Sequence, residues 1–164
     1  MKAISLWQPW ASLWFSAAKI HETRHWPLKH RGWLVVHAAK RTIDDFQGED
    51  DLDEVCDRVL GKGWSSAMPR GALIGAVEII ECRRTEDILK GFQELDDYVC
   101  GDFSEGRYGW KRADKFITFE KPVPYRGMQS LFDVPDSVIP KRTVLSFPGD
   151  PDLELFPVGA EHKM

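Results

Sequence analysis

The sequence predicts an α+β fold in which a small β-barrel of short strands is flanked by α-helices. Strand-like and helix-like segments alternate along the chain without an internal repeat or a low-complexity block. A chain of 164 residues that is 43% hydrophobic and 29% charged can bury one core, but it is too short for two ordinary domains. We therefore expect one globular domain over residues 1–136 and an irregular, proline-rich extension over residues 137–164.

The first elements are predicted by hydrophobic spacing. Residues 2–6 are typical of a strand, and Pro9 suits the first turn of a helix that follows. The apolar stripe of this helix has the spacing i, i+3, i+4, i+7 and consists of Trp10, Leu13, Trp14 and Ala17. We expect Trp7 and the tryptophans of this stripe to lie in the core.

Two extended segments follow the first helix. Residues 20–26 are predicted to be extended, which places Glu22 and Arg24 on one face, within reach of an ion pair. Gly32 begins a clear strand that runs to residue 39, and its alternation puts His37 on the same face as Trp33.

The middle of the chain predicts a helix over residues 43–60, because acidic residues crowd its first turn and an apolar stripe follows. Residues 71–84 are expected to form a long strand, and Gly75 within it indicates a bulge or a close approach of another backbone. Thr85 is expected to cap a third helix with an apolar face made of Ile88, Phe92 and Leu95.

The last predicted elements are extended. Strands are expected over residues 108–111 and 116–120, after a loop at residues 100–107. A further extended piece ends at residues 131–135, beyond which the proline-rich extension begins.

Charge is distributed unevenly along the chain. The net charge is −4, yet residues 1–40 contain six Lys or Arg against one acidic residue, and residues 41–60 contain eight acidic residues against two Arg. Five of the seven tryptophans lie in the first 40 residues. Positive charge beside aromatic rings suits a polyanion that carries flat bases.

The three cysteines are Cys56, Cys82 and Cys100, and they form neither a CxxC pair nor a metal-ligand spacing. This pattern favours a reduced, cytoplasmic setting. We expect no membrane partner, because no run of 18 apolar residues is present and Gln8-Pro9 interrupts the apolar start that superficially resembles a signal peptide.

A charged motif carries a family resemblance. The segment Ala17-x-Lys19-x-x-Glu22-x-Arg24 resembles the G-x-K-x-x-E-x-R signature of the ASCH family, a branch of the PUA-like superfamily. Other segments resemble the family in the expected order: Leu6-Trp7-Gln8-Pro9-Trp10, Arg31-Gly32, His37-Ala38-Ala39-Lys40, Pro69-Arg70-Gly71, Gly101-Asp102-Phe103-Ser104, Tyr108-Gly109-Trp110 and Pro124-Tyr125-Arg126-Gly127.

The resemblance covers about residues 1–135 and is that of a stand-alone ASCH protein of bacterial or phage type. It implies a PUA-like β-barrel with flanking helices and a cleft between barrel and helices. One departure is Ala17 where the signature has Gly, which would be costly if the backbone there needed a positive φ.

The candidate nucleic-acid-binding residues combine cations with rings, and they are Lys19, Arg24, Trp26, Arg31, His37, Lys40, Tyr108 and Trp110. Lys19 and Arg24 offer donors to phosphate, and Arg does so bidentately. The rings offer stacking faces. Each has a structural alternative: the Glu22–Arg24 pair as a salt bridge, His37 as a hydrogen-bonded core residue, and the aromatic rings as core.

The resemblance implies binding of RNA or another single-stranded nucleic acid, with ribonuclease activity as an open alternative. In that alternative Glu22 or His37 would be the base, and Lys19, Arg24 and Lys40 would stabilise charge on the phosphate. Binding needs no cofactor, and Mg²⁺ enters only for the nuclease. The acidic run at residues 49–54 lacks an EF-hand pattern, so no metal site is expected.

Two further hypotheses compete with these. Relatives that hydrolyse the acetyl amide of N4-acetylcytidine use a Lys and, three residues later, a Thr nucleophile. This chain has Lys19 but Glu22 at the Thr position, and Thr23 would face the other way, which disfavours an amidohydrolase. The other hypothesis is a protein-interaction module, suggested by the acidic helix at residues 49–57 and the proline-rich tail.

Overall fold

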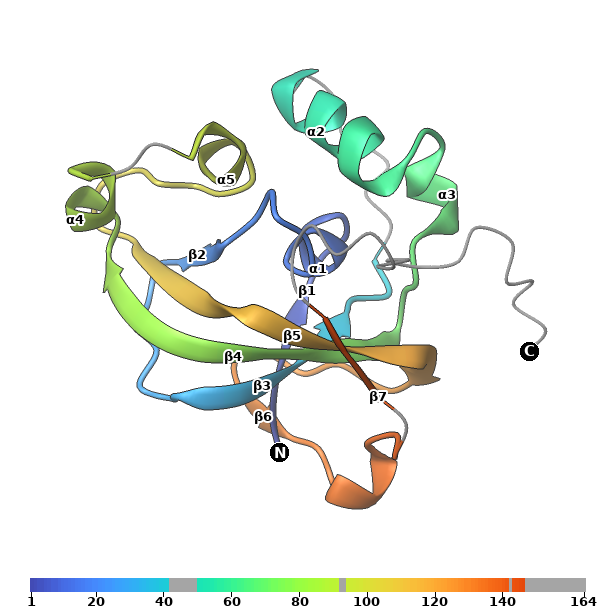
Figure 1. Ribbon diagram of the computed structural model, residues 1–164. Coiled ribbons are helices and arrows are strands. Elements are labelled where there is room, and N and C mark those ends of the chain that lie inside the picture. Colours follow the sequence, from blue (N-terminus) through green and yellow to red (C-terminus); the bar gives the residue numbers. More distant parts are fainter. Residues whose placement is uncertain (42–49, 92–93, 142, 147–164) are drawn as a thin grey trace.

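The computed structural model describes residues 1–41, 50–91, 94–141 and 143–146, and their strands form one curled sheet (Figure 1). The strands are β1 (Lys2–Leu6), β2 (His21–Arg24), β3 (Gly32–Ala38), β4 (Ala72–Arg84), β5 (Tyr108–Pro124), β6 (Phe132–Asp133) and β7 (Thr143–Ser146). The helices are α1 (Trp10–Leu13), α2 (Asp50–Leu60), α3 (Trp64–Ala67), α4 (Thr85–Leu89), α5 (Leu95–Val99) and the 3-10 turn η1 (Asp136–Val138).

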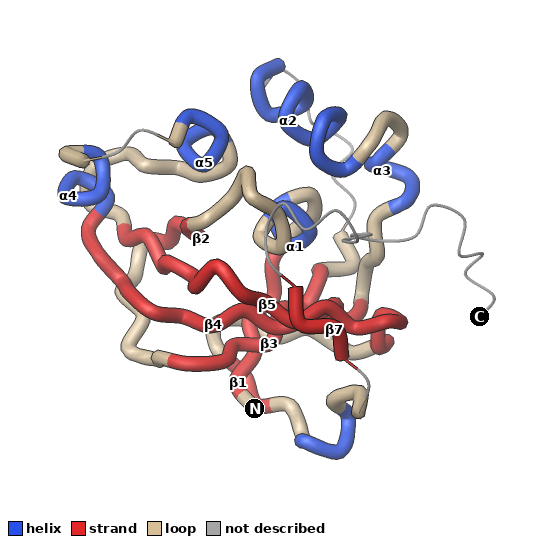
Figure 2. Tube along the Cα trace, in the orientation of Figure 1, coloured by secondary structure: helices blue, strands red, loops and turns tan. Residues whose placement is uncertain are grey.

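The order of the sheet is β2-β5-β4-β3-β1-β6, and β7 pairs with β5 beside this path. β1 and β3 are parallel, with Ser5 opposite His37, whereas the other pairs are antiparallel. Figure 2 shows the helices α1 to α5 gathered on one side of the curled sheet. The predicted α+β class is confirmed: a half-barrel sheet with flanking helices.

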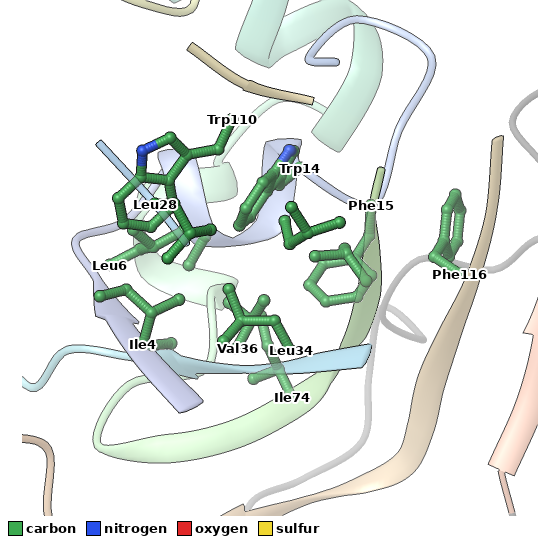
Figure 3. Packing of buried hydrophobic residues seen from close by; sticks show 14 residues of the cluster. Ile4, Leu6, Trp14, Phe15, Leu28, Leu34, Val36, Ile74, Trp110 and Phe116 are labelled. Carbon is green, nitrogen blue, oxygen red and sulfur yellow. The ribbon is translucent and has the colours of Figure 1, made fainter. Parts of the chain in front are cut away.

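The main core lies between the curled sheet and α1. Trp14 and Phe15, at the end of α1, pack against Leu34 and Val36 of β3 and against Trp110 of β5 (Figure 3). This arrangement follows from the pattern of the sequence, because alternate residues of β3 face the helix.

A buried arginine fastens α1 to the sheet. Arg112 of β5 donates from Nε to the carbonyl oxygen of Trp14 at 2.7 Å and from Nη2 to that of Ser16. Burial lowers the pKa of this guanidinium to about 10, so it stays charged at neutral pH. It satisfies carbonyls that the end of a helix leaves free.

The backbone is closely packed at Gly75 and unstrained at Ala17. The pairing of β3 and β5 with β4 shifts register around Gly75, and a Cβ there would overlap the carbonyl oxygen of Ile117 and the ring of Phe15. The close approach predicted for Gly75 is therefore confirmed. Ala17 carries no strain, because Ser130 is the only non-glycine residue with positive φ in the described ranges.

The predicted third helix is wrong in its extent. It breaks into α4 and α5, Leu95 is 73% exposed rather than buried, and Phe92 lies outside the described residues. Thr85 does not cap the helix, because its hydroxyl donates to the carbonyls of Ser104 and Arg107. Asp97 of α5 accepts from the backbone N–H groups of Ile20 and His21, at the start of β2.

Three other boundaries differ from the sequence-based prediction. The two strands expected at residues 108–111 and 116–120 are one strand, β5, because β4 offers it a partner along nearly its whole length. The extension is not wholly irregular, since residues 143–146 pair with β5 as β7. α1 spans only four residues, fewer than its predicted apolar stripe. The helix predicted over residues 43–60 is described from Asp50 onward as α2, and its predicted start lies outside the described residues.

In the described part of the chain, no helix has the length and apolar character needed to cross a membrane. The three cysteines are free thiols, and Cys56 and Cys100 are buried. Burial raises the pKa of Cys56 to about 12 and that of Cys100 to about 11, so both stay protonated at neutral pH.

Candidate nucleic-acid interface

The charged signature forms an internal network at the start of β2. Lys19 is 1% exposed, and its Nζ donates to the carbonyls of His21 at 2.7 Å and Cys100 at 3.0 Å. The same Nζ lies 3.1 Å from Oε2 of Glu22. An ammonium group has three donors, so these acceptors use all of them. Lys19 therefore does not offer a donor to phosphate in this structure, contrary to the sequence-based prediction.

Arg24 continues the network across the open side of the half-barrel. Its Nε lies 3.1 Å from Oε1 of Glu22, which confirms the predicted ion pair, and its Nη2 donates to the carbonyl of Ser5 at 3.2 Å. Arg24 thus joins β2 to β1, which are not paired through their backbones. Its guanidinium also lies 5.8 Å from the ring centre of Trp110, a cation–π contact.

The opposite face of β2 is fastened to α5. Oδ1 of Asp97 accepts from the backbone N–H groups of Ile20 at 2.6 Å and His21 at 2.9 Å, and Oδ2 lies 2.7 Å from Nδ1 of His21. Burial would raise the pKa of Asp97, but the hydrogen bonds from His21 and the backbone lower it below its usual range. Sequence reasoning missed this pair, because 76 residues separate its members and no local spacing links them.

His37 is a structural residue in this fold. It is 2% exposed, its Nε2 lies 2.8 Å from the carbonyl of Tyr125, and its Nδ1 lies 2.8 Å from Oγ of Ser5. A carbonyl can only accept, so Nε2 carries the proton and Nδ1 accepts from the hydroxyl. Burial lowers the pKa of His37, and the hydrogen bond with Tyr125 opposes this shift only in part. The lowered pKa favours the neutral ring. The structural alternative therefore fits better than a proton-transfer role.

The predicted stacking rings prove to be mainly core. Trp110 is 0% exposed and packs edge-on against Trp26 with ring centres 4.6 Å apart, so its prediction as a stacking platform is wrong. Tyr108 is half-buried opposite Arg24 in the β2–β5 register, under the guanidinium of Arg84. β2 and β5 bring these rings together with Arg24, but they turn them toward the core.

Trp7 departs from its sequence-based prediction in the opposite sense. It is 48% exposed rather than buried, and the guanidinium of Arg41 lies 4.5 Å from its ring centre. Helical spacing placed Trp7 in the core, but the residue precedes α1 and sits where β1 ends. Trp14, by contrast, is buried as predicted.

Exposed cations and Trp7 lie at the same end of the parallel strands β1 and β3. Their carboxyl ends meet at one edge of the sheet, so Trp7 after β1 lies beside Lys40 and Arg41 after β3. The stem of Lys40 lies beside Gly71, whose carbonyl accepts from the backbone N–H of Tyr125 at 3.0 Å. The exposed Arg126 follows Tyr125 in the chain. We call Trp7, Lys40, Arg41 and Arg126 the basic edge.

Arg31 lies apart from the basic edge. It precedes β3, whereas Lys40 follows it, and at the rise of an extended strand the two ends of β3 are roughly 20 Å apart. Its Nη1 donates to the carbonyls of Leu28 at 2.8 Å and His30 at 2.9 Å. Of the predicted binding residues, Lys40 is therefore the fully exposed cation at this edge. Arg24 is partly buried and donates to the carbonyl of Ser5 in β1.

No group of three His, Cys, Asp or Glu side chains in residues 1–41, 50–91, 94–141 and 143–146 is arranged to hold a metal ion. The acidic residues of the run at 49–54 that the structure describes lie exposed in the first turn of α2, where a helix dipole favours them. They therefore form the solvated helix start that the sequence indicates.

In sequence, this chain is distantly similar to two known proteins. Activating signal cointegrator 1 from Homo sapiens is 29% identical over 96 residues, and that from Mus musculus is 30% identical over 94 residues. Each match covers 56% of this chain and 16% of the relative. The chain thus spans about a sixth of the length of these relatives.

Solved structures give a similar result. ASCH from Zymomonas mobilis superimposes with a TM-score of 0.45 and 14% identity, covering 84% of this chain and 89% of that one. A tyrosine-to-phenylalanine mutant of the same Zymomonas mobilis protein gives a TM-score of 0.47 and 15% identity, with coverage of 84% and 91%. The sequence model of the ASCH domain matches residues 4–123, well over half of the chain. This protein therefore belongs to the ASCH domain family.

Proposed function

We propose that this protein binds nucleic acid, and RNA first of all, through the basic edge. ASCH domains are generally linked to RNA binding. The observation that carries the proposal is the basic edge in a protein of net charge −4. Arg41 contacts the half-exposed Trp7, the exposed Lys40 precedes Arg41 and lies beside Gly71, and the exposed Arg126 follows Tyr125, whose backbone N–H bonds Gly71. Cations there neutralise phosphates and release counterions, and the indole offers a face to a base.

The structure supports nucleic-acid binding better than it supports RNA cleavage in which the predicted catalytic residues take part. Lys19, Glu22 and His37 are buried, and each is hydrogen-bonded or ion-paired inside the protein. A general base must come within hydrogen-bond distance of the ribose hydroxyl that it deprotonates. In this arrangement their partners are the protein's own groups, so a ribonuclease built on them would first have to open the network.

Amide hydrolysis is supported still less. Glu22 occupies the position of the Thr nucleophile, and both of its oxygens are engaged by Lys19 and Arg24. The hydroxyl of Thr23 lies on the other face of β2 and accepts from the backbone N–H of Asp102 at 2.9 Å. Neither group is placed to attack a substrate carbonyl beside Lys19.

The test is a binding screen with labelled single- and double-stranded RNA and DNA over a range of salt concentrations. Lys40→Ala and Arg126→Ala are each expected to weaken binding and to reduce the salt slope by about one. Lys90→Ala is the matched control, because it removes one exposed cation that follows α4, pairs with Asp87 and does not belong to the basic edge. Its affinity should equal that of the wild type.

Failure of the wild-type protein to retain any of the four nucleic acids at low salt would overturn the proposal. Equal losses in all three variants would place the binding surface elsewhere. The same samples, run with and without Mg²⁺ and scored for shortened RNA, decide the ribonuclease alternative.

A further inference from the structure

We infer that Trp7 and Arg41 form a stacking site for one unpaired base, so that the protein prefers single-stranded over double-stranded nucleic acid. This inference rests on the proposed function and adds the class of strand that the basic edge recognises. It starts from an indole that is 48% exposed, in a chain that buries Trp14 and Trp110 completely.

The backbone of Trp7 is held in place from both sides. Its carbonyl accepts from the backbone N–H of Ala11 at 3.0 Å, and Leu6 before it is paired with Ala38 of β3. The next residue, Gln8, is buried, and its side-chain amide forms hydrogen bonds with Ser12 and with the carbonyl of Pro69. A ring presented from such a fixed segment loses little conformational entropy when a ligand stacks on it.

Arg41 complements the indole. Its guanidinium lies 4.5 Å from the ring centre, the distance of a cation–π contact. A planar guanidinium can stack on a ring and still direct its N–H groups at a phosphate or a base edge. An unpaired base beside Trp7 would thus meet an apolar face and a positive charge together.

The geometry separates two contributions to binding. Lys40 can contribute only its charge, and it attracts the phosphates of single and double strands alike. Stacking on Trp7 requires a base whose face is free, which a duplex does not offer. The preference for single strands should therefore depend on Trp7, whereas the salt dependence should depend on the cations.

The experiment measures the affinity of the full chain for a labelled oligouridine of about 12 nucleotides and for an RNA duplex of about the same length. Trp7→Ala should weaken oligouridine binding about tenfold and leave duplex binding unchanged. Trp7→Phe keeps a ring and should recover most of the loss. Tyr98→Ala is the matched control, because Tyr98 is 50% exposed on α5 and should affect neither ligand.

The outcomes separate this inference from the proposed function. If Lys40→Ala weakens the binding of both ligands while Trp7→Ala changes the affinity for neither, the stacking site is overturned and the basic edge stands. A second outcome is that Trp7→Ala weakens the binding of both ligands equally while thermal melting shows that the variant is folded. In that case the ring contributes no preference for single strands, and the inference is likewise overturned. If the wild type binds neither ligand here and none of the four nucleic acids of the screen, both proposals fail; if it binds neither ligand here but retains a DNA in the screen, this inference alone is overturned.

Discussion

Lys19, Glu22 and Arg24 form a line of charges whose hydrogen-bonding capacity is used mainly inside the protein. Lys19 is buried with one carboxylate and two carbonyls around its ammonium group, and the carboxylate is shared with Arg24. A buried cation is tolerated only when such partners replace water. At the scale of the residue, the signature therefore acts first as a structural network, which sets where Arg24 lies.

Glu22→Gln should lower the free energy of unfolding by about 3 kcal/mol, because it leaves the buried Lys19 without its carboxylate. Chemical denaturation of this variant, of Lys19→Met and of the double variant tests the coupling. The double variant should lose less than the sum of the single losses, since it removes both charges together. Additive losses would contradict the assignment of a coupled pair.

Residue-scale prediction from sequence succeeded where neighbours along the chain decide and failed where distant ones do. The Glu22–Arg24 pair follows from the alternation of a strand, so it was predictable. The burial of Lys19 depends on Cys100, and the burial of Trp110 depends on packing against Trp26. No spacing in the sequence connects these partners, so the sequence leaves Lys19 and Trp110 among the candidate binding residues.

At the scale of the element, the short helix α5 holds the start of β2 in place. Asp97 gives it three contacts with Ile20 and His21, and the carbonyl of Cys100 at its end accepts from Lys19. Arg107 adds a bond from Nη2 to the carbonyl of Thr23 at 3.2 Å. The segment expected to continue one helix thus fastens β2.

Asp97→Asn should destabilise the protein by about 2 kcal/mol at pH 7, because a charge-assisted contact with His21 is lost. The pKa of Asp97 is lowered in the folded state, so its contribution is present above the unfolded pKa of about 4. It is lost as the pH falls through the lowered folded pKa.

Unfolding titrations at neutral and acid pH measure this difference. The gap between wild type and Asp97→Asn should narrow on acidification. Asp96→Asn is the matched control, since Asp96 makes an exposed pair with Arg58 and should change stability little. A gap that is constant from pH 7 to below pH 3 would contradict the role assigned to Asp97.

At the scale of the whole molecule, the half-barrel is closed by a side chain. The sheet runs from β2 to β6 without a backbone ladder between β2 and β1, and Arg24 spans that gap to the carbonyl of Ser5. Just beyond Ser5 along β1, the parallel ends of β1 and β3 present the basic edge. Closure and the proposed binding surface are therefore neighbours in one structure.

Arg24→Met should lower the melting temperature by about 3–6 °C, because it removes the hydrogen bond that links β2 to β1. It also takes one cationic partner away from the Glu22 carboxylate. Arg58→Met provides a control in which an exposed ion pair is lost, and its shift should stay near zero. Calorimetry compares the two. Equal melting temperatures for Arg24→Met and the wild type would show that the bridge does not stabilise the fold.

The sequence by itself determined the α+β class, most strands, the close approach at Gly75 and the family to which the chain belongs. These features depend on periodicity, on glycine and on motifs read within short windows. Only the tertiary structure decided which charges and rings face water. It buried Lys19, His37 and Trp110 and exposed Trp7, because burial is set by contacts between segments that lie far apart along the chain.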